Sequence, residues 1–144
     1  MANIENFDST FENCELLENI GNSNNLSIIS AQKANKMFNN CKNLKTVSFS
    51  NPGNVSGDSP LLFMSSKFNN CELLENLDLS NLNPENVLTL DYAFSDCKKI
   101  ASLDTMAQFN IQSVINLDSI FNNCEKQVYI KEYVFYIRKV VKMK

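Results

Sequence analysis

The chain has 144 residues, of which 44% are hydrophobic, and it carries a formal net charge of −3 with a sequence pI of about 4.9. This length fits one domain with a sizeable core, and the acidic balance argues against nucleic acid as a partner. No run of about 18 apolar residues is present, so the sequence predicts no membrane span.

The average charge conceals an asymmetry along the chain. Residues 1–125 hold seven Lys and Arg against 15 Asp and Glu, a net charge of −8. Residues 126–144 hold six Lys and Arg and one Glu, a net charge of +5. The first residues lack the basic start and apolar run of a signal peptide. We therefore expect a cytoplasmic protein, or a cell-surface or secreted one whose leader has been removed.

A seven-residue pattern recurs five times: a helix-capping residue, Phe three positions later, and Cys three positions after the Phe. The five cysteines are separated by intervals of 27, 30, 26 and 27 residues and are Cys14, Cys41, Cys71, Cys97 and Cys124. A period in this range predicts a solenoid, in which each repeat buries its apolar face against its neighbours.

Each unit opens with apolar residues seven and four positions before the Phe, which can face one core. They are Ile4 and Phe7, Ala31 and Ala34, Leu61 and Met64, Val87 and Leu90, Val114 and Leu117. The first pair shows that the chain starts inside a unit, with no polar cap before it. An uncapped end exposes core, so we expect a truncated array or a homodimer through the N-terminal end.

The middle of each unit reads as one short helical turn. The residues three before the Phe are Asp8, Asn35, Ser65, Asp91 and Asp118, all of types that cap a helix N-terminus. Phe and Cys, three residues apart, would share one face of such a turn. Helices pack roughly 10 Å apart and a disulfide needs Cα atoms within about 7 Å, so we expect a ladder of free, buried thiols.

Each unit ends in a short strand, of which Leu74-Glu75-Asn76-Leu77-Asp78-Leu79-Ser80 is the strongest copy. Its alternation of apolar and polar residues predicts a half-buried strand, and one strand per unit would build a parallel sheet. The outward-facing residues of this sheet are the candidate partner-binding residues: Thr46, Ser48, Ser50, Asn76, Asp78, Ser80, Ser102, Asp104 and Met106.

Two segments depart from the pattern. Residues 51–60 carry two of the three Pro and two of the three Gly, which predicts a loop inserted between a strand and the next turn. Residues 128–144 are basic and rich in β-forming residues, and a helical stripe fits them as well. We interpret residues 1–127 as the solenoid and residues 128–144 as a C-terminal capping segment, with an anchor for a membrane surface or an acidic partner as the alternative.

Chemistry that enzymes commonly use is missing from this chain. It contains no His, which excludes His-dependent triads and His-ligated metals. It also contains neither a phosphate-binding glycine loop nor a dinucleotide fingerprint. We therefore predict no catalytic, cofactor-binding or metal-binding residues and no cofactor.

The run from Phe68 through Asn70-Cys71-Glu72-Leu73-Leu74 to Leu77-Asp78-Leu79-Ser80, followed by Ala93-Phe94, resembles the repeat of BspA-like leucine-rich repeat proteins. The resemblance spans about residues 3–127 and departs at Asn22 and Thr105, where a strand aliphatic is typical. It implies an α/β fold: a leucine-rich-repeat solenoid of four to five coils, each with a short helical turn and a short parallel strand.

The same resemblance implies a non-catalytic surface protein that takes part in adhesion and binds proteins through the strand face. The residues alone leave a second hypothesis open. A small acidic cytoplasmic inhibitor or regulator could dock on a basic nucleic-acid-binding protein by charge complementarity.

Overall fold

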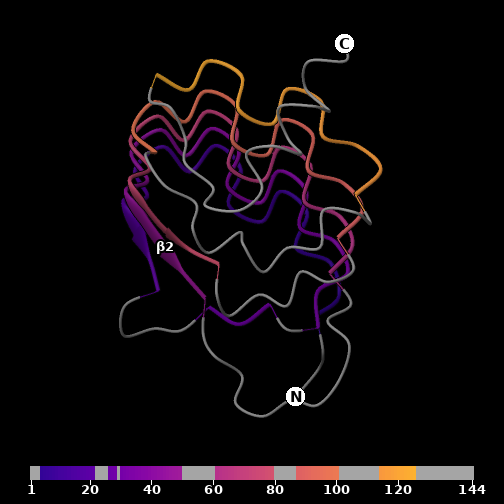
Figure 1. The fold of residues 1–144 in the computed structure, drawn as a ribbon. Coiled ribbons are helices and arrows are strands. Elements are labelled where there is room, and N and C mark those ends of the chain that lie inside the picture. Colours follow the sequence, from indigo (N-terminus) through magenta and orange to yellow (C-terminus); the bar gives the residue numbers. More distant parts are fainter. Residues whose placement is uncertain are drawn as a thin grey trace.

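The structure, a computed structural model, describes residues 4–21, 26–28, 30–49, 61–79, 87–100 and 114–125. Three short strands, β1 (Asn19–Ile20), β2 (Thr46–Ser48) and β3 (Asn76–Asp78), form one parallel sheet in the order β1-β2-β3. They lie on one side of the molecule (Figure 1). The register places Ile20, Val47 and Leu77 beside one another. These three residues are the apolar positions that the sequence predicted for the strands.

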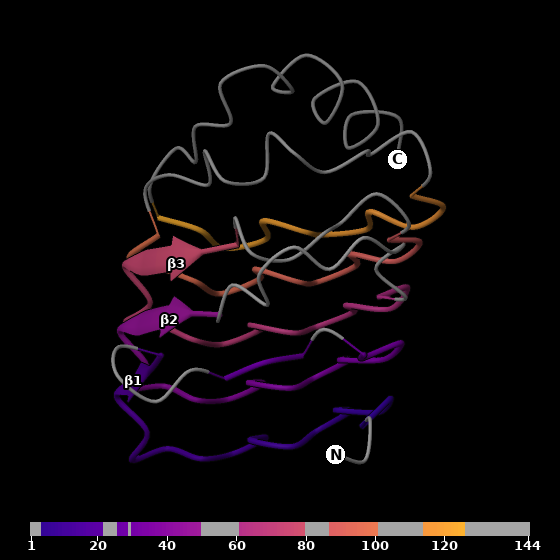
Figure 2. The same ribbon diagram turned by 90° about the horizontal axis from the view of Figure 1, so that it is seen from below.

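A second line of parallel contacts runs through the segments that precede each Phe. Single bridges join Asn6 to Lys33, Lys33 to Phe63, Phe63 to Thr89, and Thr89 to Asn116. Each unit therefore lies beside the next in chain order, and residues 4–21 and 114–125 occupy opposite ends of the described stack (Figure 2).

The five turn segments, residues 8–13, 35–40, 65–70, 91–96 and 118–123, are not the helical turns that the sequence suggested. In each segment the residues two before and two after the Phe have positive φ, as Lys36 (φ 54°) and Asn40 (φ 61°) do around Phe38. A left-handed residue at every such position is incompatible with a helix, and no helix occurs in the described ranges. The backbone instead makes successive i to i+3 turns, from Thr10 N–H to the Phe7 carbonyl and from Glu12 N–H to the Ser9 carbonyl.

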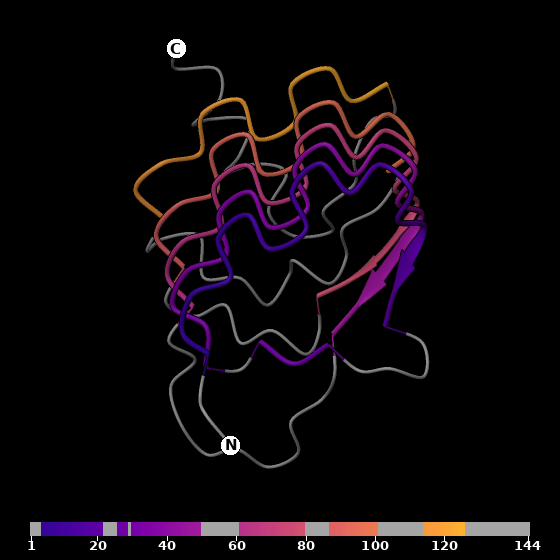
Figure 3. The same cartoon turned by 180° about the vertical axis from the view of Figure 1, so that it is seen from behind.

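The N–H groups that do not close these turns bind the neighbouring unit. Phe11 N–H donates to the Met37 carbonyl, Phe38 N–H to Lys67, and Phe68 N–H to Ala93, each at 2.9 Å. Backbones joined in this way lie about 4.8 Å apart, as in a sheet, so the spacing of roughly 10 Å expected from helix packing is wrong. The turn segments follow one another along the stack in the view from behind (Figure 3).

The residues expected to cap helices bind across units instead. Asp8 Oδ1 accepts the N–H of Asn35 at 2.7 Å, and Asn35 Oδ1 accepts the N–H of Ser65 at 2.9 Å. These side chains satisfy a backbone donor, as a cap would, but the donor belongs to the same position of the next unit. The prediction of helix N-caps is wrong, although the chemical role of the side chain is the same.

The core is a column of stacked phenylalanine rings. Neighbouring rings of Phe11, Phe38, Phe68, Phe94 and Phe121 lie 5.3 to 5.7 Å apart between centroids and within 15° of parallel. The three inner rings are fully buried. Expected core positions such as Ala34, Met64, Leu90 and Leu44 are also fully buried, but Ile4, in the first unit, is 58% exposed.

The five cysteines form a second column beside the rings, and all are free. Each thiol from Cys41 onward donates to the Phe carbonyl of the preceding unit, at 3.0 to 3.2 Å. Cys41, Cys71 and Cys97 are buried as expected, whereas Cys14 is exposed and Cys124 is partly so. Burial raises the pKa values of the Cys41, Cys71 and Cys97 thiols, that of Cys41 to about 11, so these three groups are inert small hydrophobes at neutral pH.

The predicted loop at residues 51–60, the capping segment at residues 128–144 and the boundary at residue 127 lie outside the described residues. In the part of the chain that the structure describes, no helix is long and apolar enough to cross a membrane.

The stacked rings generate a stability prediction. Phe94 contacts the rings of Phe68 and Phe121 and is fully buried, so Phe94→Ala should lower the free energy of unfolding by roughly 3–5 kcal/mol. Leu16→Ala removes a side chain that is 91% exposed and should change it by less than about 0.5 kcal/mol. Urea denaturation followed by circular dichroism measures both, and equal midpoints for the two variants would refute the core assignment.

Candidate functional site

The outward side of the sheet carries two rows of polar side chains. The first row contains Asn19, Thr46 and Asn76, which are direct partners in the parallel register. Thr46 Oγ1 donates to Asn19 Oδ1 at 2.8 Å. Asn19 and Asn76 are exposed and Thr46 is half-buried. This row therefore presents amide and hydroxyl groups to solvent from three neighbouring strands.

The second row contains Ser48 and Asp78, which are partners in the register of β2 and β3. Asp78 is exposed and Ser48 half-buried. On the β1 side this row ends at Gly21, which has a φ of 111°. A Cβ atom on Gly21 would lie 2.0 Å from Ser48 Oγ, so glycine permits both this backbone conformation and the close approach of the two strands.

Four of the nine candidate partner-binding residues, Thr46, Ser48, Asn76 and Asp78, are thus brought together on one face. The other five, Ser50, Ser80, Ser102, Asp104 and Met106, lie outside the described residues. Asn19, from the unit that seemed weakest in sequence, belongs to the same face. The sequence could have predicted this position of Asn19, because Asn19, Thr46 and Asn76 each lie five residues after the cysteine of their unit.

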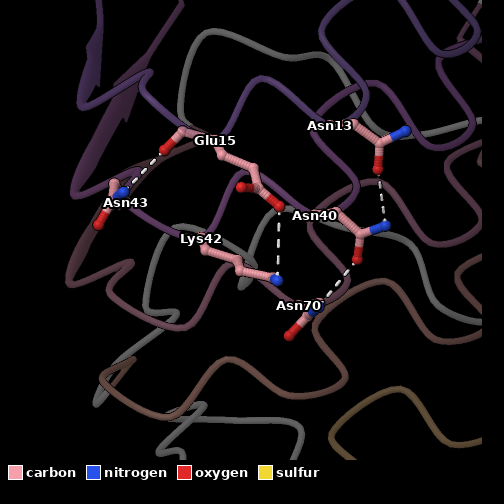
Figure 4. Close-up of polar contacts among 6 residues, drawn as sticks. All are labelled: Asn13, Glu15, Asn40, Lys42, Asn43 and Asn70. Carbon is pink, nitrogen blue, oxygen red and sulfur yellow. Dashed lines mark hydrogen bonds and ion pairs between the residues drawn. The ribbon is translucent and has the colours of Figure 1, made fainter.

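Charged side chains alternate in sign from unit to unit beside the turn segments. The residue after each cysteine is Glu15, Lys42, Glu72, Lys98 and Glu125 in chain order. Lys42 lies 3.5 Å from Glu15, and Lys98 lies 2.6 Å from Glu72 (Figure 4 shows the first pair). The hydrogen bond to Glu72 raises the pKa of Lys98. Three positions further on, Lys45 binds Glu18 at 2.9 Å in the same manner.

Asparagine side chains form a ladder at the end of the turn segments. Asn40 donates to Asn13 at 2.9 Å and Asn70 donates to Asn40 at 2.8 Å (Figure 4). Asn123 continues the pattern by donating to Asp96 at 3.0 Å. An amide both donates and accepts, so each asparagine can bind a copy of itself on either side.

One buried charge breaks the apolar pattern. Lys67 occupies the position before the Phe that Met37, Ala93 and Ile120 occupy in other units, and it is fully buried. Its Nζ has no hydrogen-bond partner among the described residues and lies 4.7 Å from the centroid of the Phe49 ring. Burial lowers the pKa of Lys67 from 10.5 to about 7. Sequence reasoning overlooked this residue, although a lysine at a position that is apolar in three other units was a usable signal.

Within the described ranges, no group of three or more Cys, Asp or Glu residues is placed to hold a metal ion. In the described ranges, neighbouring segments pair in parallel around a column of phenylalanine rings, and the three strands present a polar face. The family comparison matches residues 58–144, more than half of the chain, to the family described as "Mycoplasma protein of unknown function, DUF285", and the chain belongs to this family. No curated protein and no solved structure matches it.

The buried lysine generates a pH-dependence prediction. Unfolded Lys67 has the ordinary pKa of 10.5 and the folded one about 7, so above about pH 7 the unfolded chain binds more protons and stability rises with pH. Between about pH 7 and about pH 8.5 this gain should reach about 2 kcal/mol. The range ends there because the raised pKa values of the buried thiols lower stability above about pH 9.

Lys67→Met, which copies Met37, should therefore stabilise the protein at pH 7 and abolish the rise. Lys99→Met replaces an exposed lysine and should leave the rise intact. Urea denaturation at the two pH values measures both effects. A Lys67→Met variant with the same pH slope as the original protein would contradict the assignment.

Proposed function

We propose that this chain is a non-catalytic protein-binding module, built as a leucine-rich-repeat solenoid of the BspA-like kind, that binds its partner through the exposed strand face. We propose further that the module serves adhesion or another surface role as part of a cell-surface or secreted protein. The observation that carries it is the pair of polar rows on β1, β2 and β3, where side chains from consecutive strands reach solvent in register.

The chemistry of this face suits recognition of another protein. Asn19, Asn76 and Asp78 are exposed and supply amide donors, amide acceptors and a carboxylate. Parallel strands space these groups at about 4.8 Å along the stack and at about 6.6 Å between alternate residues of one strand. Such a grid can pair with the polar groups of a partner surface.

A non-catalytic role is consistent with the residue types of the face. The face combines amide, hydroxyl and carboxylate groups with no His, which the chain lacks altogether. The described cysteines other than Cys14 and Cys124 are buried, and burial raises their pKa values. They therefore supply neither an accessible nucleophile nor a thiolate at neutral pH.

The charge of residues 1–125 favours one second candidate. A body of net charge −8 suits an acidic regulator that docks on a basic nucleic-acid-binding protein. This mode of binding would depend on long-range charge and would weaken steeply as salt rises. Binding through the polar grid would change much less with salt.

Substitutions on the face test the main proposal. The double variant Asn76→Ala and Asp78→Ala removes two exposed side chains of β3. Its free energy of unfolding should stay within about 0.5 kcal/mol of that of the original chain. The double variant should lose most binding to any protein that the original chain captures from cell-surface extract. Gln32→Ala removes an exposed side chain outside the sheet and should retain that protein.

Capture is compared at low and high salt by quantitative mass spectrometry of the bound proteins. Equal capture by the face variant and the Gln32→Ala control would reject the strand face as the binding site. A single basic protein that is released at high salt would instead favour the acidic regulator.

A further inference from the structure

The amine of Lys67 lies between two aromatic rings inside the core. Its Nζ atom is 4.7 Å from the centroid of the Phe49 ring and 5.8 Å from that of the Phe68 ring. The residue is fully buried, and Nζ has no hydrogen-bond partner among the described residues. Two ring faces compensate an ammonium group only in part for its lost hydration. Protonation of Lys67 therefore favours any opening that admits water to Nζ.

No charged group among the described residues compensates an ammonium group at this position. The turn segment that contains Lys67, residues 65–70, holds no other titratable side chain. The buried thiols nearby bind carbonyl groups and stay uncharged, because burial raises their pKa values. The turn segments on either side and strands β2 and β3 carry charged or phenolic groups only on side chains that are at least partly exposed: Lys36, Asp78, Asp91, Tyr92 and Asp96.

The two rings beside Nζ differ in how firmly they are held. Phe68 stacks between Phe38 and Phe94 in the ring column, so its displacement would break the column. Phe49 directly follows β2, and its backbone is joined to Leu26 by an isolated parallel bridge. Displacement of Phe49 leaves the ring column intact. The smallest opening that brings water to Nζ is therefore at the end of β2.

We propose that Lys67 forms a pH-sensitive conformational switch, in which gain of a proton favours a local opening that moves Phe49 aside and brings the ammonium group into water. Ser48, in the second polar row of the strand face, is adjacent to Phe49 in sequence, so the opening would disturb one end of that row. The switch follows from the packing around Lys67 and does not depend on the proposed function.

The direction of the pH effect follows from linkage. Burial lowers the pKa of Lys67 to about 7 in the closed state, whereas the open state regains the ordinary value of 10.5. The open state therefore binds more protons between these two values, and opening becomes more favourable as the pH falls. These pKa values give an opening constant that is about 10-fold larger at pH 6 than at pH 8. Below about pH 6 the dependence levels off, because Lys67 is then protonated in both states.

Hydrogen exchange of the full chain, followed by mass spectrometry, measures the opening. Rates at pH 6 and pH 8 are corrected for the intrinsic exchange rate at each pH. Residues 46–49 should be less protected than residues 35–40, which belong to the same unit and whose alternate N–H groups bind the next unit. The protection of residues 46–49 should fall about 10-fold from pH 8 to pH 6.

Two variants show whether Lys67 causes the fall. Lys67→Met copies Met37, the buried residue at the same position of the preceding unit, and should abolish the fall. Lys99→Met replaces an exposed lysine and should retain it. The Cε resonance of Lys67 in a ¹³C-labelled chain gives a second readout and should titrate near pH 7.

Four results would overturn the proposal. Equal protection of residues 46–49 and 35–40 would mean that exchange requires unfolding of the whole array rather than a local opening. Protection of residues 46–49 that is unchanged between the two pH values would exclude coupling to a proton. An unchanged pH effect in Lys67→Met would exclude Lys67 as its source. A Lys67 resonance that titrates near the ordinary pKa of lysine would show that the amine is hydrated in the closed state.

Discussion

The whole structure depends on one backbone constraint, the alternation of hydrogen bonds in the turn segments. Two left-handed residues around each Phe direct alternate N–H groups within the unit and toward the next unit. Left-handed backbone is strained for residues other than Gly and Asn, and it persists because every such turn is bonded to the next. All five turn segments keep six residues while the intervals between cysteines vary from 26 to 30, so length variation falls elsewhere in each unit.

Because neighbouring units pair in register, each side chain lies beside the side chain at the same position of the next unit. This arrangement favours residue types that can contact copies of themselves. Rings stack on rings and amides bind amides, as the Phe and Asn columns do, and each thiol from Cys41 onward binds the Phe carbonyl of the preceding unit. Like charges repel one another, so the position after each cysteine alternates between Glu and Lys. Each exposed Glu–Lys pair contributes little stability. If a unit were displaced by one repeat, however, Glu would lie beside Glu or Lys beside Lys at this position, which is unfavourable. The alternation therefore favours the observed order of units.

The sequence predicted the core positions and the strand face because both depend on spacing alone. Buried Leu44, Val47 and Leu74 follow from their distance to the cysteine. The helical turn was predicted wrongly because Phe and Cys three residues apart fit a helix and two successive turns equally well. Ser, Asp and Asn also favour helix caps and turns alike. The distinguishing signal was Asn two residues after the Phe in four of five units, since Asn tolerates positive φ.

Stacking in register also means that the residues that hold the units together differ from those that could recognise a partner. The columns that hold the units together repeat nearly the same side chain at each level, so they cannot encode the identity of a partner. The outward strand positions vary more: Gly21, Ser48 and Asp78 differ from one another, and Thr46 stands between Asn19 and Asn76. Under the proposed function, these outward strand positions are where specificity for a partner would be set.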